Sequence, residues 1–472
     1  MRVAVASDTR RFGDVVLGGS PARLFRLTGA GTAALDRWAG GARPEPGAET
    51  TLAWRLVDAG VVELVVDTEE MVEGGGDSPD ALTIVVPTHG RAEQLGVGLL
   101  KLRAAHPSER IIVVDDGSPD AGAIAVVAAA AGAEVIRRDS AGGAAAARNA
   151  GLALVETPLV AFVDSDVEVG PGWHSPLRSL LMLERVALVA PRVRAPSGPT
   201  VRARYDAARS PLDLGTRASP VRPGGRVSYL PAAAVVARTE AIRSVGGFDE
   251  SLRVGEDVDL LWRLHEAEWR IRYEPSSAVL HRDPPERAPL GGWVARRMAY
   301  GTSAAVLEQR HPGSARPLVA SAWSVAVWGP LACGHPVAAA LALFTSSAAL
   351  IPKLTGVPPS VALRLGIRGH LAAGEQTARA LVRPWWPLTV AAAVFSRRAR
   401  RILPVVAVLP AMVDRRRRRE TMAPLAWIAW STLDDASYGL GVWLGALRAR
   451  SVASLCPRRP ASADPQSRGT CV

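Results

Sequence analysis

The sequence predicts an α/β protein whose central domain contains a sheet with buried parallel strands. Three strand-like segments support this prediction: Leu82–Val86, Arg110–Val114 and Leu159–Val163. They alternate with helix-like segments, and strands this apolar are typically buried on both faces, as in parallel sheets. Each segment ends in polar residues, and ligands of open α/β sheets bind beyond the carboxyl ends of the strands. We therefore expect a ligand site at that edge of the sheet.

The third segment ends in Asp164-Ser165-Asp166. Two carboxylates one residue apart repel each other unless a divalent cation lies between them. Their hard oxygen atoms suit Mg²⁺ or Mn²⁺, ions that bind through one or two carboxylates plus substrate phosphates. A solvated turn is the alternative for so short an acidic motif. His281 follows a further strand-like segment and is either another ligand of the metal or phosphate, or a structural histidine.

The first two segments carry candidate ligands of a nucleotide. Pro87, Thr88 and Arg91 follow the first strand, and Asp115 and Asp116 follow the second. A carboxylate at Asp115 or Asp116 can accept the N3–H of uracil, and the backbone at Pro87 and Thr88 can meet the same base. A tight turn capped by the Asp side chains is the alternative.

A glycine-rich segment, Gly142–Gly151, precedes the third strand. Its glycines permit close approach of the backbone to a ligand, and the forked Arg148 guanidinium can bind a phosphate or ribose oxygen. Asn149 is a candidate for the same ligand. No Gly-Lys-Ser/Thr follows, so the segment is not a Walker A loop. An ordinary helix start is the alternative.

Asp257 opens a predicted helix whose Leu260, Leu261 and Leu264 share one face. The helix dipole keeps a carboxylate in the first turn ionised. Such a carboxylate suits a general base that takes a proton from an acceptor hydroxyl. We therefore single out Asp257 and the neighbouring Glu256 as catalytic candidates, with simple helix capping as the alternative.

The order of these motifs resembles the family 2 glycosyltransferases, which have the nucleotide-sugar-binding GT-A fold, a Rossmann-like mixed sheet. The matching segments are Ile84–Arg91, Val113–Ser118, Gly142–Gly151, Val163–Asp166 and Gly246–Asp259.

This resemblance implies roles for individual residues. Asp116 would bind the nucleotide base, while Asp164 and Asp166 would hold the nucleotide and its metal ion. Asp257 would be the base of an inverting transfer, which turns an α-linked donor into a β-linked product. A UDP-sugar, UDP-glucose first, is the expected donor. No Gln-x-x-Arg-Trp motif lies near Asp257, which disfavours long-chain processive synthesis.

Composition allows two or three domains and disfavours several other functions. The 472 residues are 48% hydrophobic, enough for more than one core. The net charge of +11 comes almost wholly from arginine, and no helix-turn-helix, zinc or aromatic-platform signature accompanies it, so we expect no nucleic-acid partner.

The three scattered cysteines predict neither a disulfide framework nor a zinc site. The N-terminus lacks a long apolar segment, so we expect no signal peptide and a catalytic domain facing the cytoplasm.

Residues 1–73 are predicted to form a small α+β domain, joined by a linker at 74–80 to a catalytic domain at 81–290. The predicted elements are strands at Val15–Pro21 and Arg23–Leu27, a helix after Thr28, a helix at Leu52–Ala59 and a strand at Val61–Val66. This order resembles PqqD-type, winged-helix-like domains, which bind a precursor peptide as an added strand. A domain that only packs on the enzyme is the alternative.

Residues 291–456 are predicted to form an apolar, α-helical, membrane-associated region, followed by a disordered tail at 457–472. Pro317–Pro352 contains no charged residue and is interrupted by Gly334-His335-Pro336. Shorter apolar pieces follow at Trp385–Phe395, Ile402–Val413, Ala423–Thr432 and Leu440–Leu447, with arginine clusters around the second of them. This pattern is typical of interfacial, re-entrant or spanning helices at the cytoplasmic face of a membrane. A soluble domain of Ala-rich helices is the alternative.

The combination of the three parts resembles the glycosyltransferases of the mycofactocin system, a family associated with a β-glucan chain on a peptide-derived redox cofactor. That resemblance implies a peptide-derived small-molecule acceptor. A membrane glycosyltransferase with a lipid-linked or polysaccharide acceptor, and an inactive GT-A scaffold that recruits a peptide, remain the alternatives.

Overall fold

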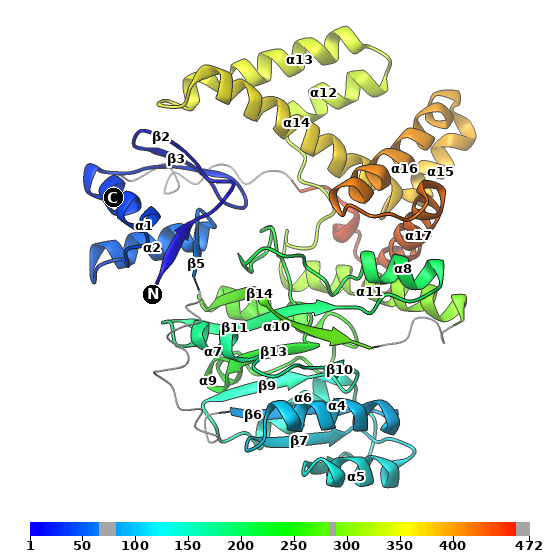
Figure 1. Ribbon diagram of the computed structural model, residues 1–472. Coiled ribbons are helices and arrows are strands. Elements are labelled where there is room, and N and C mark those ends of the chain that lie inside the picture. The colour runs from blue at the N-terminus through cyan, green and yellow to red at the C-terminus, as the bar shows by residue number, and fades with distance from the viewer. Residues whose placement is uncertain (66–81, 283–288, 459–472) are drawn as a thin grey trace.

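The computed structural model describes residues 1–65, 82–282 and 289–458, which form three parts (Figure 1). A small N-terminal unit and a region of long helices flank a central α/β domain. The predicted linker at 74–80 lies outside the described residues, as does Val66 at the end of one predicted strand.

The described residues of the central domain form a nine-stranded mixed sheet in the order β10-β14-β11-β13-β9-β6-β7-β8, with β12 paired to β14. Its parallel pairs are β6–β7, β6–β9, β7–β8 and β11–β14, and the other pairs are antiparallel. The strands are β6 Leu82–Thr88, β7 Arg110–Asp115, β8 Glu134–Arg137, β9 Leu159–Val163, β10 Val167–Glu168, β11 Val186–Arg194, β12 Ser219–Pro220, β13 Ala234–Arg238 and β14 Arg270–His281. The three strands expected from apolar runs are confirmed.

Helices cover both faces of this sheet: α4 Ala92–Ala105, α5 Ala121–Ala130, α6 Ala144–Ala153, α7 Ser175–Leu181, α8 Val201–Ala208, α9 Thr239–Ser244 and α10 Glu256–Glu266. Alternate residues of one strand enter different cores. Ile84 and Val86 join the core that contains α4 and α7, whereas Val85 joins the core that contains α6 and α10. Burial on both faces explains why the strand sequences are continuously apolar.

The N-terminal unit contains more strands than the sequence predicted. Its elements are β1 Val3–Val5, β2 Arg10–Phe12, β3 Val15–Gly18, β4 Arg23–Arg26, α1 Gly29–Ala39, α2 Ala48–Ala59 and β5 Val62–Leu64. Strands β2, β3 and β4 form one antiparallel sheet, and β1 pairs with β5. Thr28 caps α1 as expected, accepting a hydrogen bond from the Gly31 N–H. The short strands β1 and β2 were not predicted because three residues carry no readable alternation.

The N-terminal unit packs on the central sheet. Asp58 at the end of α2 accepts hydrogen bonds from Arg270 and Arg272 of β14. The Arg270 guanidinium also lies 4.1 Å from the ring centre of Trp54. The apolar core of the unit is continuous with the core beneath α4 and α7.

The helical region consists of α11 Leu290–Arg310, α12 Ala322–Ala332, α13 Pro336–Ala348, the 3₁₀ turns η2 Ile351–Lys353 and η3 Ala453–Leu455, α14 Pro359–Val382, α15 Trp386–Phe395, α16 Arg397–Arg417 and α17 Pro424–Arg448. The apolar pieces predicted at Ala423–Thr432 and Leu440–Leu447 are in fact two parts of the single helix α17. The predicted piece at Ile402–Val413 is the middle of α16, whose ends are the two arginine clusters.

Glycines allow α11 and α17 to cross in close contact. A Cβ atom added to Gly441 would lie 2.0 Å from the Met298 carbonyl oxygen, and one added to Gly301 would lie 2.2 Å from the Tyr438 carbonyl oxygen. Only glycine therefore fits at these two positions.

Buried ion pairs fix α17 to the central domain. Asp434 accepts a hydrogen bond from the Tyr205 hydroxyl at 3.0 Å and lies 3.3 Å from Arg297. Arg209, just after α8, donates to Asp435 at 3.0 Å. The boundary predicted at residue 290 thus separates segments that pack together.

Two further expectations concern the end of the chain and the membrane. Arg458 was predicted to be disordered, but its backbone N–H donates to the Leu318 carbonyl at 2.7 Å; the tail beyond it lies outside the described residues. One described helical stretch, Pro336–Lys353, has the length and composition of a membrane-crossing segment, and 17% of it is buried.

Candidate active site

The predicted metal ligands meet only in part. Asp166, in the turn after β9, lies beside two residues, with 3.3 Å between its carboxylate oxygens and both His281 Nε2 and Arg91 Nη1. Strand β14 brings His281 there because Val167 of β10 pairs with it. The Asp164 carboxylate instead accepts a hydrogen bond from Arg148 at 2.8 Å.

In this structure the two carboxylates therefore contact different arginines, and their convergence on one cation stays a prediction. Among the described residues, ligand atoms of Asp164, Asp166 and His281 do not all lie within 4.8 Å of one another. The physical reason is charge compensation, because each carboxylate has an arginine of its own. Asp166 and His281 do converge, and an oxygen with an imidazole nitrogen fits Mn²⁺ or Mg²⁺. Asp164 and His281 face the same cavity and complete the candidate donor set.

Asp115 and Asp116 organise the loop after β7. Both are buried, and Asp115 accepts hydrogen bonds from the Ser118 N–H at 2.9 Å and from Arg137 at 2.5 Å. Burial alone would raise the pKa of Asp115, but the hydrogen bonds from Ser118 and Arg137 hold it below its usual value. The two oxygens of Asp116 accept from the N–H groups of Gly142 and Gly143, at 2.9 and 2.7 Å. The turn alternative is thus realised here, and base binding by Asp116 stays a prediction.

Pro87, Thr88 and Arg91 lie where the sequence predicted, at the carboxyl end of β6. Pro87 and Thr88 are still within the strand and are buried, and the Thr88 hydroxyl donates to the Gly90 carbonyl. Arg91 has a left-handed backbone with φ of 59° and caps α4, which turns its side chain toward Asp166.

Arg148 was predicted to bind a phosphate or ribose oxygen, but its guanidinium holds two carboxylates. It donates to Asp164 at 2.8 Å and to Glu256 at 2.9 Å, and it is only 4% exposed. Burial alone would lower the pKa of Arg148, whereas Asp164 and Glu256 raise it above its usual value. Arg148 is therefore a positioning residue between the strand-end turn and helix α10.

The side-chain amide of Asn149 is bonded to the protein itself, and its contact with the nucleotide stays a prediction. Its amide oxygen accepts the Phe248 N–H at 2.9 Å, and its amide nitrogen donates to the Phe248 carbonyl at 2.8 Å and to Glu250 at 2.9 Å. Every hydrogen-bonding position of the amide nitrogen is in use. Asn149 instead fixes the glycine turn that precedes α10.

Asp257 lies in the first turn of α10 and faces the cavity. One carboxylate oxygen accepts the Val258 N–H at 2.8 Å and the other lies 3.4 Å from the Ala232 N–H. The helix dipole was expected to keep Asp257 ionised, but burial, with the neighbouring Glu256 carboxylate, outweighs it and raises the pKa of Asp257 to about 7. A carboxyl group with such a pKa can accept a proton near neutral pH. Glu256 itself is held by Arg148, which leaves Asp257 as the available base.

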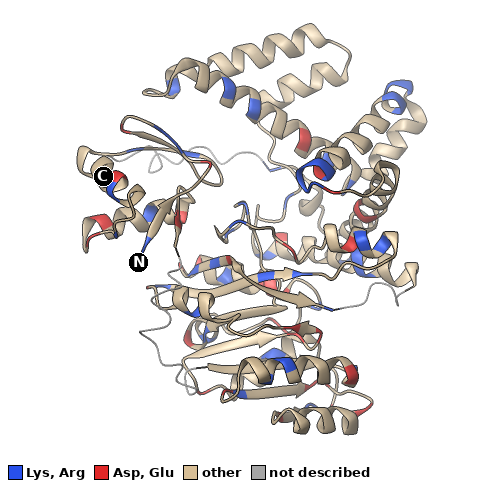
Figure 2. Cartoon of the chain, viewed as in Figure 1, with Lys and Arg blue, Asp and Glu red and all other residues tan. Residues whose placement is uncertain are grey.

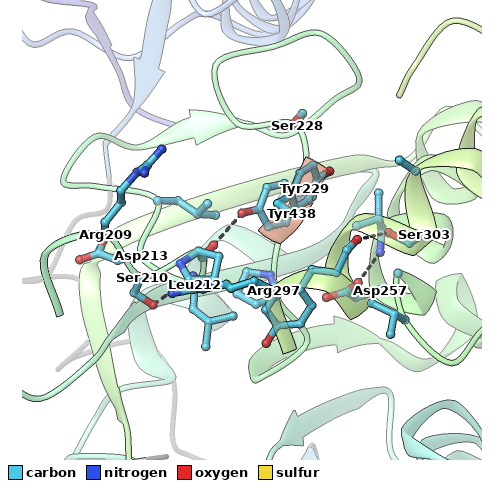
Figure 3. A pocket seen from close by; sticks show the side chains of 18 of the residues that line it. Arg209, Ser210, Leu212, Asp213, Ser228, Tyr229, Asp257, Arg297, Ser303 and Tyr438 are labelled. Carbon is cyan, nitrogen blue, oxygen red and sulfur yellow. Dashed lines mark hydrogen bonds between the residues drawn. The ribbon is translucent and has the colours of Figure 1, made fainter. Parts of the chain in front are cut away.

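A cavity of about 1560 Å³ surrounds Asp257, between the central domain and the helical region. Figure 3 shows Tyr229 from the central domain beside Tyr438 from α17, and it labels Arg297 of α11 and Asp257 of α10 among the other residues that line the cavity. The Tyr229 hydroxyl donates to the Pro211 carbonyl at 2.6 Å, and the Arg383 guanidinium lies 3.9 Å from the Tyr438 ring centre. Because small-ligand sites usually measure about 300–1000 Å³, the cavity has room for more than one such ligand.

Sequence reasoning missed the residues that the helical region contributes to this cavity. Tyr300 and Ser303 of α11, Arg383 after α14, and Tyr438 of α17 all line it. Their segments read only as apolar helices, and no local spacing connects them to Asp257.

A second cluster of possible metal ligands lies away from the cavity. His106, Glu109 and His174 are all buried and, of the groups in the described chain, are the ones whose ligand atoms lie within 4.8 Å of one another. The Trp173 indole N–H donates to His106 Nε2 at 2.8 Å, so this nitrogen carries no proton. The proton then resides on Nδ1, which lies 3.1 Å from Glu109. With both ring nitrogens engaged, His106 has no lone pair for a metal, and the cluster is structural.

The fold and site have known relatives. A family model described as glycosyl transferase family 2 matches residues 83–245. Two relatives described as pre-mycofactocin glycosyltransferase, from Mycobacterium tuberculosis strains CDC 1551 / Oshkosh and H37Rv, are each 40% identical to this chain over 477 aligned residues. The alignment covers 97% of this chain and 96% of each relative. A solved mannosyltransferase, PcManGT from Pyrobaculum calidifontis in complex with GDP-Man and Mn²⁺, shares 16% identity with a TM-score of 0.44, over 84% of this chain and 94% of its own.

The family model and the two relatives define a glycosyltransferase, whose central domain has a GT-A-like α/β fold. More narrowly, the chain belongs to the pre-mycofactocin glycosyltransferase family, within the family 2 glycosyltransferases.

Proposed function

We propose that this enzyme transfers a hexose, glucose from UDP-glucose, to the peptide-derived precursor of mycofactocin with inversion at the anomeric carbon. The observation that carries the proposal is Asp257, a carboxyl group with a raised pKa on the wall of a large cavity that Asp164 and His281 also line. The acceptor is inferred from the relatives, which are described as acting on pre-mycofactocin.

The proposed chemistry uses a single base. The Asp257 carboxylate takes the proton of an acceptor hydroxyl, whose oxygen attacks the anomeric carbon as the bond to the diphosphate breaks. Without a covalent sugar intermediate, one displacement inverts the configuration and gives a β-linked product. Arg148 supports the step by binding Asp164 and Glu256, so that Asp257 is the carboxylate without an arginine hydrogen bond among the three.

A divalent cation, Mg²⁺ or Mn²⁺, is the proposed cofactor, held by Asp166, Asp164 and His281. When bound, it supplies positive charge that stabilises the departing diphosphate.

We further propose that the enzyme works at the cytoplasmic face of the membrane and that the N-terminal unit receives a precursor peptide. Among the described strands, β2 and β4 each have one unpaired edge, which is what strand addition requires.

The test is transfer from UDP-[¹⁴C]glucose to purified pre-mycofactocin, with products identified by mass spectrometry and the new linkage by NMR. Asp257→Asn should abolish transfer by the folded protein, and Asp166→Ala should remove its dependence on added Mn²⁺ together with most of the activity. Full turnover by both variants would refute the proposed site. Label in the lipid extract rather than in the small-molecule fraction would favour a lipid-linked acceptor.

A further inference from the structure

Helices α13 and α15 expose large apolar side chains in rows. On α13, Val337, Leu341 and Phe344 are 73, 62 and 63% exposed, and their spacing places them on one face of the helix. On α15, Leu388 and Phe395 are 57 and 89% exposed and share a face in the same way. We call these five residues the apolar face. Exposed apolar rows of this kind mark interaction surfaces.

The two helices with the apolar face meet at their turns. An added Cβ atom at Gly334, in the turn between α12 and α13, would lie 3.0 Å from an Arg398 guanidinium nitrogen. Arg398 begins α16, three residues after Phe395. The start of α13 and the end of α15 therefore lie near each other, and so do the ends of their apolar rows.

A cluster of positive charge lies directly after α15, at the start of α16. Arg397, Arg398, Arg400 and Arg401 open α16, and no acidic residue lies between Trp385 and Val413. Figure 2 shows the contrast, with α12 and α13 free of charged residues and a blue band at the start of α16. Apolar residues beside arginines are typical of surfaces that bind anionic lipid headgroups.

The inner side of the α12–α13 hairpin is already occupied. The Trp328 indole donates to the His370 carbonyl at 2.9 Å, and the Ser346 hydroxyl lies 2.8 Å from His370 Nε2. Both contacts are to α14, which carries Arg364, Arg368 and Glu375. A hairpin that crossed the bilayer would take this charged helix into the hydrocarbon, at high cost. Only its outer side is available to lipid.

From these contacts we infer that the apolar face and the four arginines form a docking surface for an anionic bilayer, on which the enzyme lies without crossing it. This inference rests on the proposed membrane location. It specifies which surface of the enzyme contacts the membrane and which class of lipid that surface binds. A second copy of the chain fits less well, because a two-fold interface here would bring the two arginine clusters together.

The experiment is co-sedimentation of the full-length protein with vesicles of phosphatidylcholine, alone or mixed with phosphatidylserine. We expect binding to the mixed vesicles. The combined variant Leu341→Ser, Phe344→Ser and Phe395→Ser should bind them at least about tenfold more weakly, because its side chains no longer enter the interface. Changing the four arginines to Gln should remove the preference for phosphatidylserine, with each contributing about fivefold.

A matched control removes exposed apolar side chains elsewhere. Val126→Ser with Met182→Ser, at positions 69 and 80% exposed in the central domain, should leave vesicle binding unchanged. Failure of the unaltered protein to sediment with either vesicle would overturn the inference. So would a triple Ser variant that binds vesicles normally but changes from dimer to monomer in analytical ultracentrifugation.

Transfer to a soluble acceptor, measured without vesicles, keeps this inference separate from the proposed function. The Ser and Gln variants should retain that activity. Vesicle binding without transfer would reject the proposed reaction and support the docking surface. Transfer without vesicle binding would support the proposed reaction and reject the docking surface.

Discussion

Two side chains decide what the active site can do, and both depend on charge in a buried setting. Asp257 carries the raised pKa, and the Arg148 guanidinium binds the carboxylates of Asp164 and Glu256. The sequence identified both as site residues. It assigned Arg148 to the ligand, because nothing in a local motif shows that Glu256, far along the chain, binds the same guanidinium.

The raised pKa of Asp257 predicts a pH dependence of catalysis. The base must be deprotonated, so kcat/KM should rise with pH through a midpoint near 7. Glu256→Gln removes the neighbouring negative charge that helps to raise this pKa, so the midpoint should move to lower pH. The measurement is the dependence of kcat/KM on pH for the unaltered enzyme and for Glu256→Gln. An unchanged or higher midpoint in the variant would contradict the assignment.

The same shift has a consequence for stability. Because the pKa of Asp257 in the folded protein lies above the ordinary value of 3.8, the folded state prefers the protonated acid, and stability is lost as pH rises toward 7. Asp257→Asn cannot ionise and should raise the melting temperature more at pH 8 than at pH 5. Thermal unfolding at the two pH values tests this, and equal shifts would argue against a raised pKa.

Loss of the Arg148 guanidinium should leave two carboxylates unpaired. We expect Arg148→Gln to lower the free energy of unfolding by about 3 kcal/mol, because breaking a buried ion pair from one side leaves uncompensated charge. Urea denaturation measures this. Arg11→Gln, which breaks a solvent-exposed pair with Asp36, is the control and should change stability by less than about 1 kcal/mol.

At the scale of elements, helix α17 shows why helix boundaries predicted from apolar runs can be wrong where charged residues interrupt the run. Asp434 and Asp435 divide its sequence into two apolar pieces, which suggested two short membrane-associated helices. In the structure they lie within one helix and pair with Arg297 and Arg209. Charged residues interrupt an apolar run, but they do not interrupt a helix whose charges have partners.

The close crossing of α11 and α17 gives a prediction with a matched control. A Cβ atom at Gly441 would lie 2.0 Å from the Met298 carbonyl, so Gly441→Ala should force the helices apart and lower stability by about 1–3 kcal/mol. Gly369 lies within α14, and apart from its own stretch of helix no described atom would lie within 4 Å of an added Cβ. Gly369→Ala should therefore be neutral or stabilise by up to about 1 kcal/mol. Denaturant unfolding of the two proteins tests the pair, and equal effects would refute the crossing.

At the scale of the whole molecule, the helical region completes the cavity around Asp257 instead of forming a separate appendage. Tyr438 and Arg383 line the same cavity as Asp257, and Asp434 ties α17 to Tyr205 of α8. A family 2 core with these helices removed would lack one wall of its cavity.

That coupling predicts cooperative unfolding. Asp434→Asn weakens the link to Tyr205 and Arg297, so calorimetry should show one transition in the unaltered protein and an earlier, separate transition of the helical region in the variant. KM for the acceptor should rise at the same time, because the cavity wall is less firmly held. The control is Asp36→Asn, which breaks a solvent-exposed ion pair with Arg11 in the N-terminal unit and should leave both measurements unchanged. A single transition in both variants would show that other contacts dominate.

The sequence by itself determined three parallel strands of the sheet, the order of the strand-end motifs and the position of Asp257 at the start of α10. These features follow from local physics: burial on both faces makes strands continuously apolar, and polar residues at strand ends mark the ligand edge. Only the tertiary structure decided which carboxylate pairs with which arginine, that Asn149 supports a turn, and that α11 and α17 close the cavity. Such contacts join segments distant in the chain, and their energies depend on packing and charge compensation that no local pattern records.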